Sequence, residues 1–195
     1  MQDPRGLTPQ INAARSAATA WVDGLLSLPN DPIEVGRYAA NIPTAWAVSI
    51  VSEIVQIAGA SMSPHEIGTF DFMMYGPTFD TTQYTRQLHN RIISQIVVIG
   101  GRWLGQGDQF DRDKEQRLLL SGINTEFTAI YAHAQIVAAR HHGVAEMEVE
   151  VEWLLGNNPC KVCEANRNKR YKIKDAEGLI PVHLNCQCAF RPVRP

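Results

Sequence analysis

The feature that most constrains this chain is a cluster of cysteine and histidine near its C-terminus. All four cysteines of the 195-residue sequence lie between residues 160 and 188, in the pattern Cys160-x-x-Cys163, then His183-x-x-Cys186-x-Cys188. Cys-x-x-Cys spacing lets two thiolates turn toward one ion, and tetrahedral zinc takes four such ligands, with sulfur at ~2.3 Å and imidazole nitrogen at ~2.0 Å. We therefore predict a zinc site among these five side chains.

Five candidate ligands compete for four positions. The pattern favours Cys160, Cys163 and Cys186 as ligands, and leaves the fourth position open between His183 and Cys188. The residue that does not bind is expected beside the metal. A site closed by four protein ligands is structural rather than catalytic. Structural zinc stabilises small domains by roughly 10 kcal/mol, so the C-terminal segment is expected to fold around its metal.

The alternative for the cysteines is a pair of disulfides, or buried thiols that act as small apolar side chains. The first ten residues, MQDPRGLTPQ, are polar and lack the apolar core of a secretory signal. Cysteines of a chain that is not exported stay reduced, which favours metal over disulfides.

Composition and charge describe a globular chain. It is 45% hydrophobic and 19% charged, with a formal net charge of −2, which argues against a protein that coats nucleic acid over its whole surface. The most apolar stretches, residues 45–60 and 92–105, fall short of the ~20 apolar residues that span a bilayer, so no membrane segment is expected. A local basic run lies between the cysteine pairs: Arg167, Lys169, Arg170, Lys172 and Lys174.

Helical periodicity dominates residues 1–143. A helix is predicted to begin at Thr8-Pro9, with apolar residues at helical spacing as far as Leu25, and to end at Pro29 and Pro32. Further helices are expected at residues 44–58, 80–99 and 123–142. Gly100-Gly101 is expected to end the helix at residues 80–99. Residues 71–80, with three aromatic side chains, are expected to form an irregular connection.

The period changes to two after Gly143. Residues 146–153 read EMEVEVEW, which predicts a half-buried strand with one acidic face, and residues 170–174 and 188–193 predict two more strands. Pro192 places the last strand at a sheet edge. The predicted fold class is α+β: a mostly helical N-terminal body, residues 1–143, followed by a small β-rich zinc-binding module, residues 144–195.

Two enzyme classes share parts of this pattern. PCKVC (residues 159–163) matches half of a zinc-deaminase signature, but no histidine is followed two residues later by the glutamate that the other half requires. HLN (residues 183–185) resembles part of an HNH nuclease motif, but no second histidine lies near it to hold a catalytic metal. Nucleic-acid chemistry therefore stays an alternative and not the main prediction.

The order of these features resembles the phage head-morphogenesis family, the Mu F-like minor head proteins. In that family an Arg-Thr-Glu helix, a Trp-bearing strand, Cys-x-x-Cys, a hairpin with an aromatic residue and Pro-x-His-Pro-Asn-Cys-Arg-Cys follow one another. The resemblance covers about residues 120–193, and the chain differs at Asn124, Asn168, Leu184 and Gln187. The matching residues are Thr125, Glu126, Trp153, Cys160, Cys163, Tyr171, Pro181, His183, Asn185, Cys186 and Cys188.

The resemblance implies a non-enzymatic structural protein of the virion or procapsid, with a helical front part. Such proteins associate with the portal vertex and act in head assembly, DNA packaging or delivery. The expected partners are the portal protein and neighbouring head or neck proteins, with packaged DNA as a further candidate and no membrane. The chain is then made in the bacterial host cytoplasm and ends in the phage head or neck, in multiple copies. The alternatives are a zinc-containing nuclease or toxin-like effector, and a zinc-ribbon nucleic-acid binder.

Overall fold

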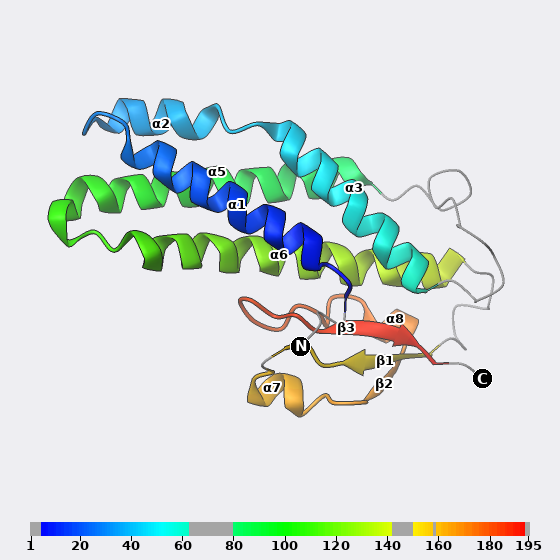
Figure 1. Ribbon diagram of the computed structural model, residues 1–195. Coiled ribbons are helices and arrows are strands. Elements are labelled where there is room, and N and C mark those ends of the chain that lie inside the picture. Colours follow the sequence, from blue (N-terminus) through cyan, green and yellow to red (C-terminus); the bar gives the residue numbers. More distant parts are fainter. Residues whose placement is uncertain (1–4, 63–79, 142–149, 158, 194–195) are drawn as a thin grey trace.

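Helices in the first three quarters of the chain and a small sheet in the last quarter form the architecture, as predicted (Figure 1). The computed structural model describes residues 5–62, 80–141, 150–157 and 159–193. The helices are α1 (Thr8–Leu26), α2 (Pro32–Ala40), α3 (Thr44–Ser61), α5 (Thr81–Gln106), α6 (Arg112–His141), α7 (Lys161–Glu164) and α8 (Ile173–Ala176), with a 3-10 turn η1 (Gly107–Gln109). The strands are β1 (Glu150–Leu154), β2 (Arg170–Lys172) and β3 (Ala189–Pro192).

Helix α6 is the centre of the helical body, because α1, α3 and α5 all pack against it. Its apolar residues recur every three or four positions and are fully buried, which is the stripe expected of a core helix. The residues of this stripe are Leu119, Ile123, Phe127, Ile130, Ala134 and Ala138. The α1 helix contributes a matching stripe of Ala14, Ala18, Trp21 and Leu25, confirming the predicted periodicity.

Two helix boundaries differ from the prediction. The Gly100-Gly101 pair does not end α5, which continues to Gln106. A Cβ built on Gly100 would lie 2.3 Å from Cγ1 of Val35. Glycine at that position therefore allows α2 to approach α5 closely and does not act as a cap. Helix α6 begins at Arg112 and not near Ile123, because the Asp111 side chain accepts a hydrogen bond from the Lys114 amide (2.9 Å) at its start.

Helix α2 was not predicted, because its flanking prolines were read only as breakers. Asp31 caps this helix by accepting a hydrogen bond from the Ile33 amide at 2.8 Å, and Pro32 occupies the first turn. Proline at that position is favourable, since it has no amide hydrogen to leave unpaired. The pair Asp31-Pro32 was the sequence signal from which this helix could have been predicted.

Helix α3 is long and apolar enough to cross a membrane, judged by length and composition alone. In the structure it packs against α5 and α6 through Ala47, Ile50, Val51 and Ile54, which are buried. The core helix of a soluble protein passes the same test of length and composition, so this one helix is weak evidence for a membrane span.

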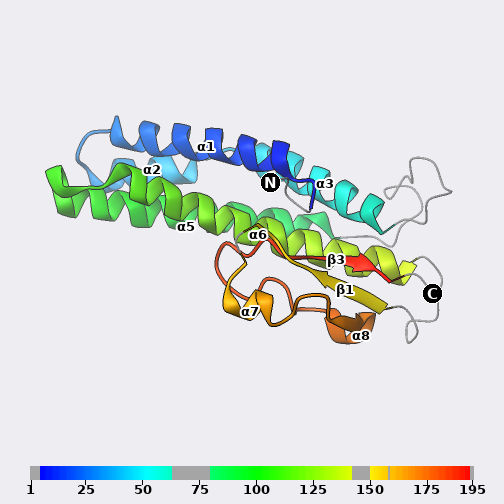
Figure 2. The same cartoon turned by 60° about the horizontal axis from the view of Figure 1, so that its bottom comes forward.

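The three strands form one antiparallel sheet in the order β2-β1-β3. The strand predicted at residues 188–193 is confirmed as an edge strand, and the one at residues 170–174 is shorter than predicted, because Ile173 begins α8. Two views show the sheet lying against α6, with β3 next to the helix (Figures 1 and 2), and Figure 1 shows β2 farther from it. Buried side chains of the helices and of the sheet belong to one hydrophobic cluster.

Some predicted features lie outside the described residues. These are the irregular connection at residues 71–79, the beginning of the acidic strand at residues 146–149, and the boundary proposed between residues 143 and 144.

Candidate metal centre

The first half of the cysteine cluster is a knuckle at the start of α7. Cys160 precedes the helix and Cys163 lies within it, and their Sγ atoms are 3.8 Å apart. The backbone amides of Cys163 and Val162 donate to the Cys160 sulfur, and these hydrogen bonds lower the pKa of the Cys160 thiol. Amides in the first turn of a helix have no carbonyl partner within it, so they are free to stabilise a thiolate.

The second half is the turn that carries His183, Cys186 and Cys188. The Cys186 amide donates to the His183 carbonyl at 3.2 Å, and Asn185 takes a left-handed conformation with φ of 60°. Asparagine tolerates that conformation better than most residues. The turn directs both cysteine side chains and the imidazole to the same side.

His183 connects the two halves. Its Nε2 lies 3.0 Å from the Cys163 sulfur, and its Nδ1 lies 2.8 Å from the Leu184 carbonyl oxygen. A carbonyl only accepts hydrogen bonds, so Nδ1 carries the proton and Nε2 keeps its lone pair. This is the tautomer that a metal-binding histidine needs, and a carbonyl partner on the other nitrogen is the usual means of fixing it.

Three of the four thiols form a buried group. Cys163, Cys186 and Cys188 have ligand atoms within 4.8 Å of one another, and each is at most 1% exposed. Burial raises the pKa of Cys163 to about 11. A hydrogen bond from Cys186 to Cys188 raises the pKa of the donor thiol and lowers that of the acceptor.

Two residues, Trp153 in β1 and Gly156 in the loop that follows it, lie beside Cys188. The Gly156 amide donates to the Cys188 sulfur, which also lowers the pKa of that thiol. A Cβ on Gly156 would lie 2.5 Å from the backbone carbon and oxygen of Gln187, so the close approach requires glycine. The buried indole Nε1 of Trp153 has no acceptor of normal geometry among the described residues, yet its N–H also helps to lower the pKa of Cys188.

The donors fit a tetrahedral metal ion. Two sulfurs bound to zinc at about 2.3 Å with tetrahedral angles stand about 3.8 Å apart, and Cys160 and Cys163 show a distance of 3.8 Å. A metal-bound thiolate would also give the Trp153 indole the acceptor it lacks. All four cysteines are free thiols, as predicted. The cluster of Cys160, Cys163, His183, Cys186 and Cys188 can therefore hold a metal ion.

Cys163 has a special place in the cluster. The five donors form two overlapping groups, one of Cys160, Cys163 and His183 and one of Cys163, Cys186 and Cys188. Only Cys163 belongs to both. The structure thus brings together all five predicted ligands, and both His183 and Cys188 lie close enough to complete the site.

Helix α6 supports the ligand turn from behind. The Asn185 amide donates to Oγ1 of Thr125 at 2.7 Å, and Nδ2 of Asn124 donates to Oδ1 of Asn185 at 3.3 Å. One turn further along α6, the buried Thr128 hydroxyl lies within hydrogen-bond distance of the Cys186 carbonyl. Nη1 of the buried Arg5, from the N-terminal segment, donates to the same hydroxyl at 2.6 Å. Sequence reasoning missed Arg5, because nothing nearby in the sequence marks it.

The acidic face predicted for β1 meets basic neighbours within the sheet. Glu150 stands opposite Lys172, and Glu152 stands between Arg170 and Arg191. Arg191 donates to Oε2 of Glu152 at 2.8 Å, and Glu152 is only 9% exposed. Basic side chains of the same sheet therefore cover part of the acidic face, at Glu150 and Glu152. The cations of the predicted basic run are all exposed.

A second concave feature lies between α6, α8 and β3, away from the cysteines. It is a cleft of about 170 Å³ with an apolar floor that includes Ile136, Ile180 and Phe190. Tyr84, His133 and Glu177 form its polar side, and Nδ1 of His133 lies 3.8 Å from Oε1 of Glu177. Its residues come from four separate elements, so no local pattern in the sequence points to it.

Comparison with protein-family models, with curated proteins and with solved structures gives no match. The resemblance to the head-morphogenesis family therefore rests on the residues and their order alone.

Proposed function

We propose that this chain is a structural protein of a phage head, which binds the portal vertex and acts in head assembly, DNA packaging or delivery. Its partners are the portal protein and neighbouring head or neck proteins. It is made in the host cytoplasm, enters the particle in multiple copies, and is not an enzyme.

The observation that carries this proposal is the contact between the two halves of the family-like motif. Thr125 lies in the segment that resembles the Arg-Thr-Glu helix, and Asn185 lies in the segment that resembles the closing His-x-Asn-Cys-x-Cys. They are joined by a 2.7 Å hydrogen bond although they are 60 residues apart in the chain. Residues that resemble a family motif in composition and order thus also form one physical unit.

The metal in the proposed protein is zinc, and its role is structural. Thiolates and a neutral imidazole are the donors that zinc prefers, and four of the five would close its coordination shell. A closed shell leaves no position for substrate or activated water. His183 has one nitrogen directed at Cys163 and the other bonded to the Leu184 carbonyl, so it is poorly placed to act as the general base of a nuclease.

Co-expression with the portal protein of the same phage tests the proposal. The chain, purified through a tag on the portal, should appear in native mass spectrometry as a complex of defined stoichiometry. A chain that stays monomeric beside the portal and cuts or binds nucleic acid would contradict the proposal and favour the nuclease or nucleic-acid-binding alternative.

A further inference from the structure

The two edges of the sheet differ in what covers them. At the β3 edge, the Phe190 amide donates to Oε1 of Gln135 at 3.0 Å, and Nε2 of Gln135 donates to the Phe190 carbonyl at 2.7 Å. One α6 side chain thus satisfies both outward backbone groups of Phe190, much as a neighbouring strand would. Edges covered in this way do not accept another strand.

The β2 edge is open in the described part of the chain. The Trp153 amide donates to the Lys169 carbonyl at 2.9 Å, and Val151 stands opposite Tyr171. In an antiparallel pair the bonded positions alternate, so the amide and carbonyl of Arg170 point away from β1. Among the described residues, no group donates to or accepts from either of them. Figure 1 shows β2 on the side of the sheet opposite the helical body.

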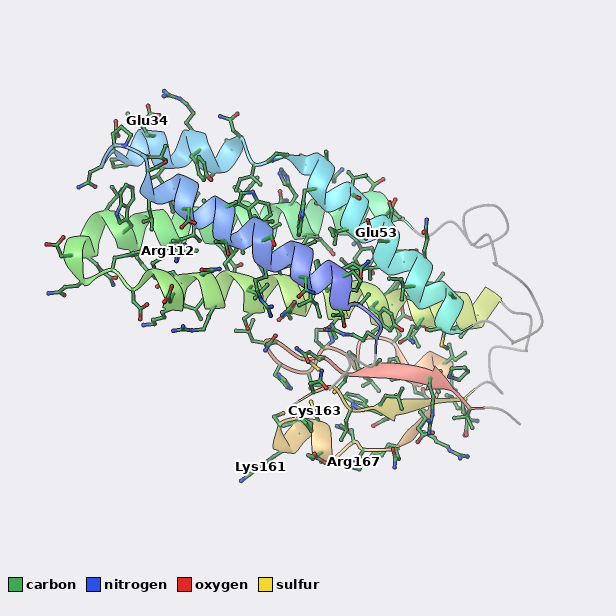
Figure 3. The ribbon with its side chains drawn as sticks, in the orientation of Figure 1. Glu34, Glu53, Arg112, Lys161, Cys163 and Arg167 are labelled. Carbon is green, nitrogen blue, oxygen red and sulfur yellow. The ribbon has the colours of Figure 1, made fainter. Side chains whose placement is uncertain are left out.

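The side chains along this edge are cationic. Arg170 and Lys172 are exposed and share one face of the sheet, because they are two residues apart on a strand. No described carboxylate lies within ion-pair distance of either cation. Figure 3 shows Lys161 and Arg167 on the same outward side of the module, while Cys163 lies nearer the helices.

The inner edge of the same strand shows what β2 pairs with. Its partner is β1, an alternation of glutamate and apolar residues, with Glu150 opposite Lys172 and Glu152 opposite Arg170. The outer edge carries the same cations on the same face. Like charges disfavour pairing with the β2 edge of a second copy, whereas an acidic strand would be attracted.

We propose that the outer edge of β2 binds an extended acidic segment of a partner protein by strand addition, with carboxylates beside Arg170 and Lys172. The backbone of Arg170 supplies the hydrogen bonds, and the two cations select for acidic residues on one face. The edge is three residues long, about 10 Å at 3.3 Å per residue, so the interaction is one part of a larger interface. This inference goes beyond the proposed function and does not depend on it.

The experiment measures fluorescence anisotropy of a labelled peptide, EVEVEW, added to the full-length, zinc-loaded protein at about 0.15 M salt, where the Debye length is about 8 Å. This peptide repeats the chemistry of the strand that β2 already pairs with. We expect saturable binding. Replacing Arg170 and Lys172 with glutamine should weaken it at least tenfold, whereas glutamine at Lys114 and Arg117, an equal loss of exposed charge at the start of α6, should change it less than twofold.

Backbone pairing is tested separately, on the unmodified protein. A peptide with N-methyl groups on alternate amides cannot form the strand hydrogen bonds along one edge, and one of the two such peptides should lose binding. Equal affinity for both methylated peptides and for the parent would overturn strand addition. An absence of peptide binding would also overturn the proposal. Tighter binding of a single-stranded DNA of equal charge would overturn it too, and would assign the surface to nucleic acid. None of these peptide results tests the proposed portal complex, because that complex is measured without the peptide.

Discussion

Thr125 on α6 holds the metal-ligand turn through one hydrogen bond, from the Asn185 amide to its Oγ1 at 2.7 Å. Thr128, one helical turn later, donates its hydroxyl hydrogen to the Cys186 carbonyl. The central helix of the body and the turn that carries the candidate ligands therefore share contacts, and loss of either contact should weaken the proposed zinc site.

Thr128→Val tests this connection. The change keeps the shape of the side chain and removes the hydroxyl that accepts from Arg5 and reaches the Cys186 carbonyl. Because these groups are buried and one is charged, we expect a loss of about 2–3 kcal/mol in the free energy of unfolding. Urea denaturation of the zinc-loaded protein measures it. Thr82→Val, at an exposed site, should change stability by less than about 0.5 kcal/mol, and equal effects of the two changes would contradict the account.

Gly156→Ala and Gly101→Ala should have opposite effects. At Gly156 the new Cβ meets the Gln187 backbone at 2.5 Å, so we expect a loss of about 1–3 kcal/mol from overpacking. At Gly101, inside α5, a Cβ meets nothing within 4 Å, and alanine should stabilise the helix by about 1 kcal/mol. Thermal unfolding of both variants in excess zinc checks the signs. An unchanged melting temperature for Gly156→Ala would show that the loop accommodates a side chain.

Single replacements in the cysteine cluster should differ in severity. Cys163 belongs to both donor groups, so Cys163→Ser should abolish zinc binding. His183→Ala and Cys188→Ser each leave four candidate donors, and each should keep a zinc ion with lower affinity. Competition with a coloured chelator gives the affinities. If His183→Ala or Cys188→Ser lost zinc as completely as Cys163→Ser, that residue would be a required ligand and the overlapping arrangement would be wrong.

The pH dependence of stability should include a contribution from His133. Burial lowers the pKa of His133 below the ordinary value of 6.5; nearby Glu177 acts in the opposite direction and Arg140 in the same direction as burial. The unfolded chain then binds a proton at a higher pH than the folded chain does. The contribution of His133 to the free energy of unfolding is therefore fully present above about pH 6.5. It is lost as the pH falls from there through the pKa of His133 in the folded protein.

The comparison of wild type with His133→Gln isolates this contribution, because the metal cluster titrates equally in both proteins. The difference in unfolding free energy between the two should shrink as the pH is lowered below about 6.5. A difference that stays constant or grows would show that His133 is not held neutral by burial.

The sequence predicted which candidate ligands come together better than it predicted the helix boundaries. The ligand set was readable because Cys-x-x-Cys and His-x-x-Cys spacing encode a local turn, and the structure brings all five residues together. Gly100 was misread because its role is set by Val35, a residue 65 positions away that needs the space. The choice between His183 and Cys188 could not be predicted either, since both reach the site only after the turn at Asn185 folds.

The supporting contacts were the hardest to foresee. Gln135 was predicted only as part of a helix, yet it bonds both backbone groups of Phe190. Arg5 reaches Thr128 across 123 residues of sequence. Neither contact has a periodic signal, because it depends on how the sheet and the N-terminal segment lie against α6.

The central claim is that the cysteine cluster is a structural zinc site, and native mass spectrometry of the chain expressed in zinc-containing medium tests it most directly. The account predicts one zinc ion per chain, lost in Cys163→Ser together with the folded C-terminal module. A chain that folds equally well without metal, with its cysteines in disulfides and an unchanged melting temperature in the presence of chelator, would contradict it.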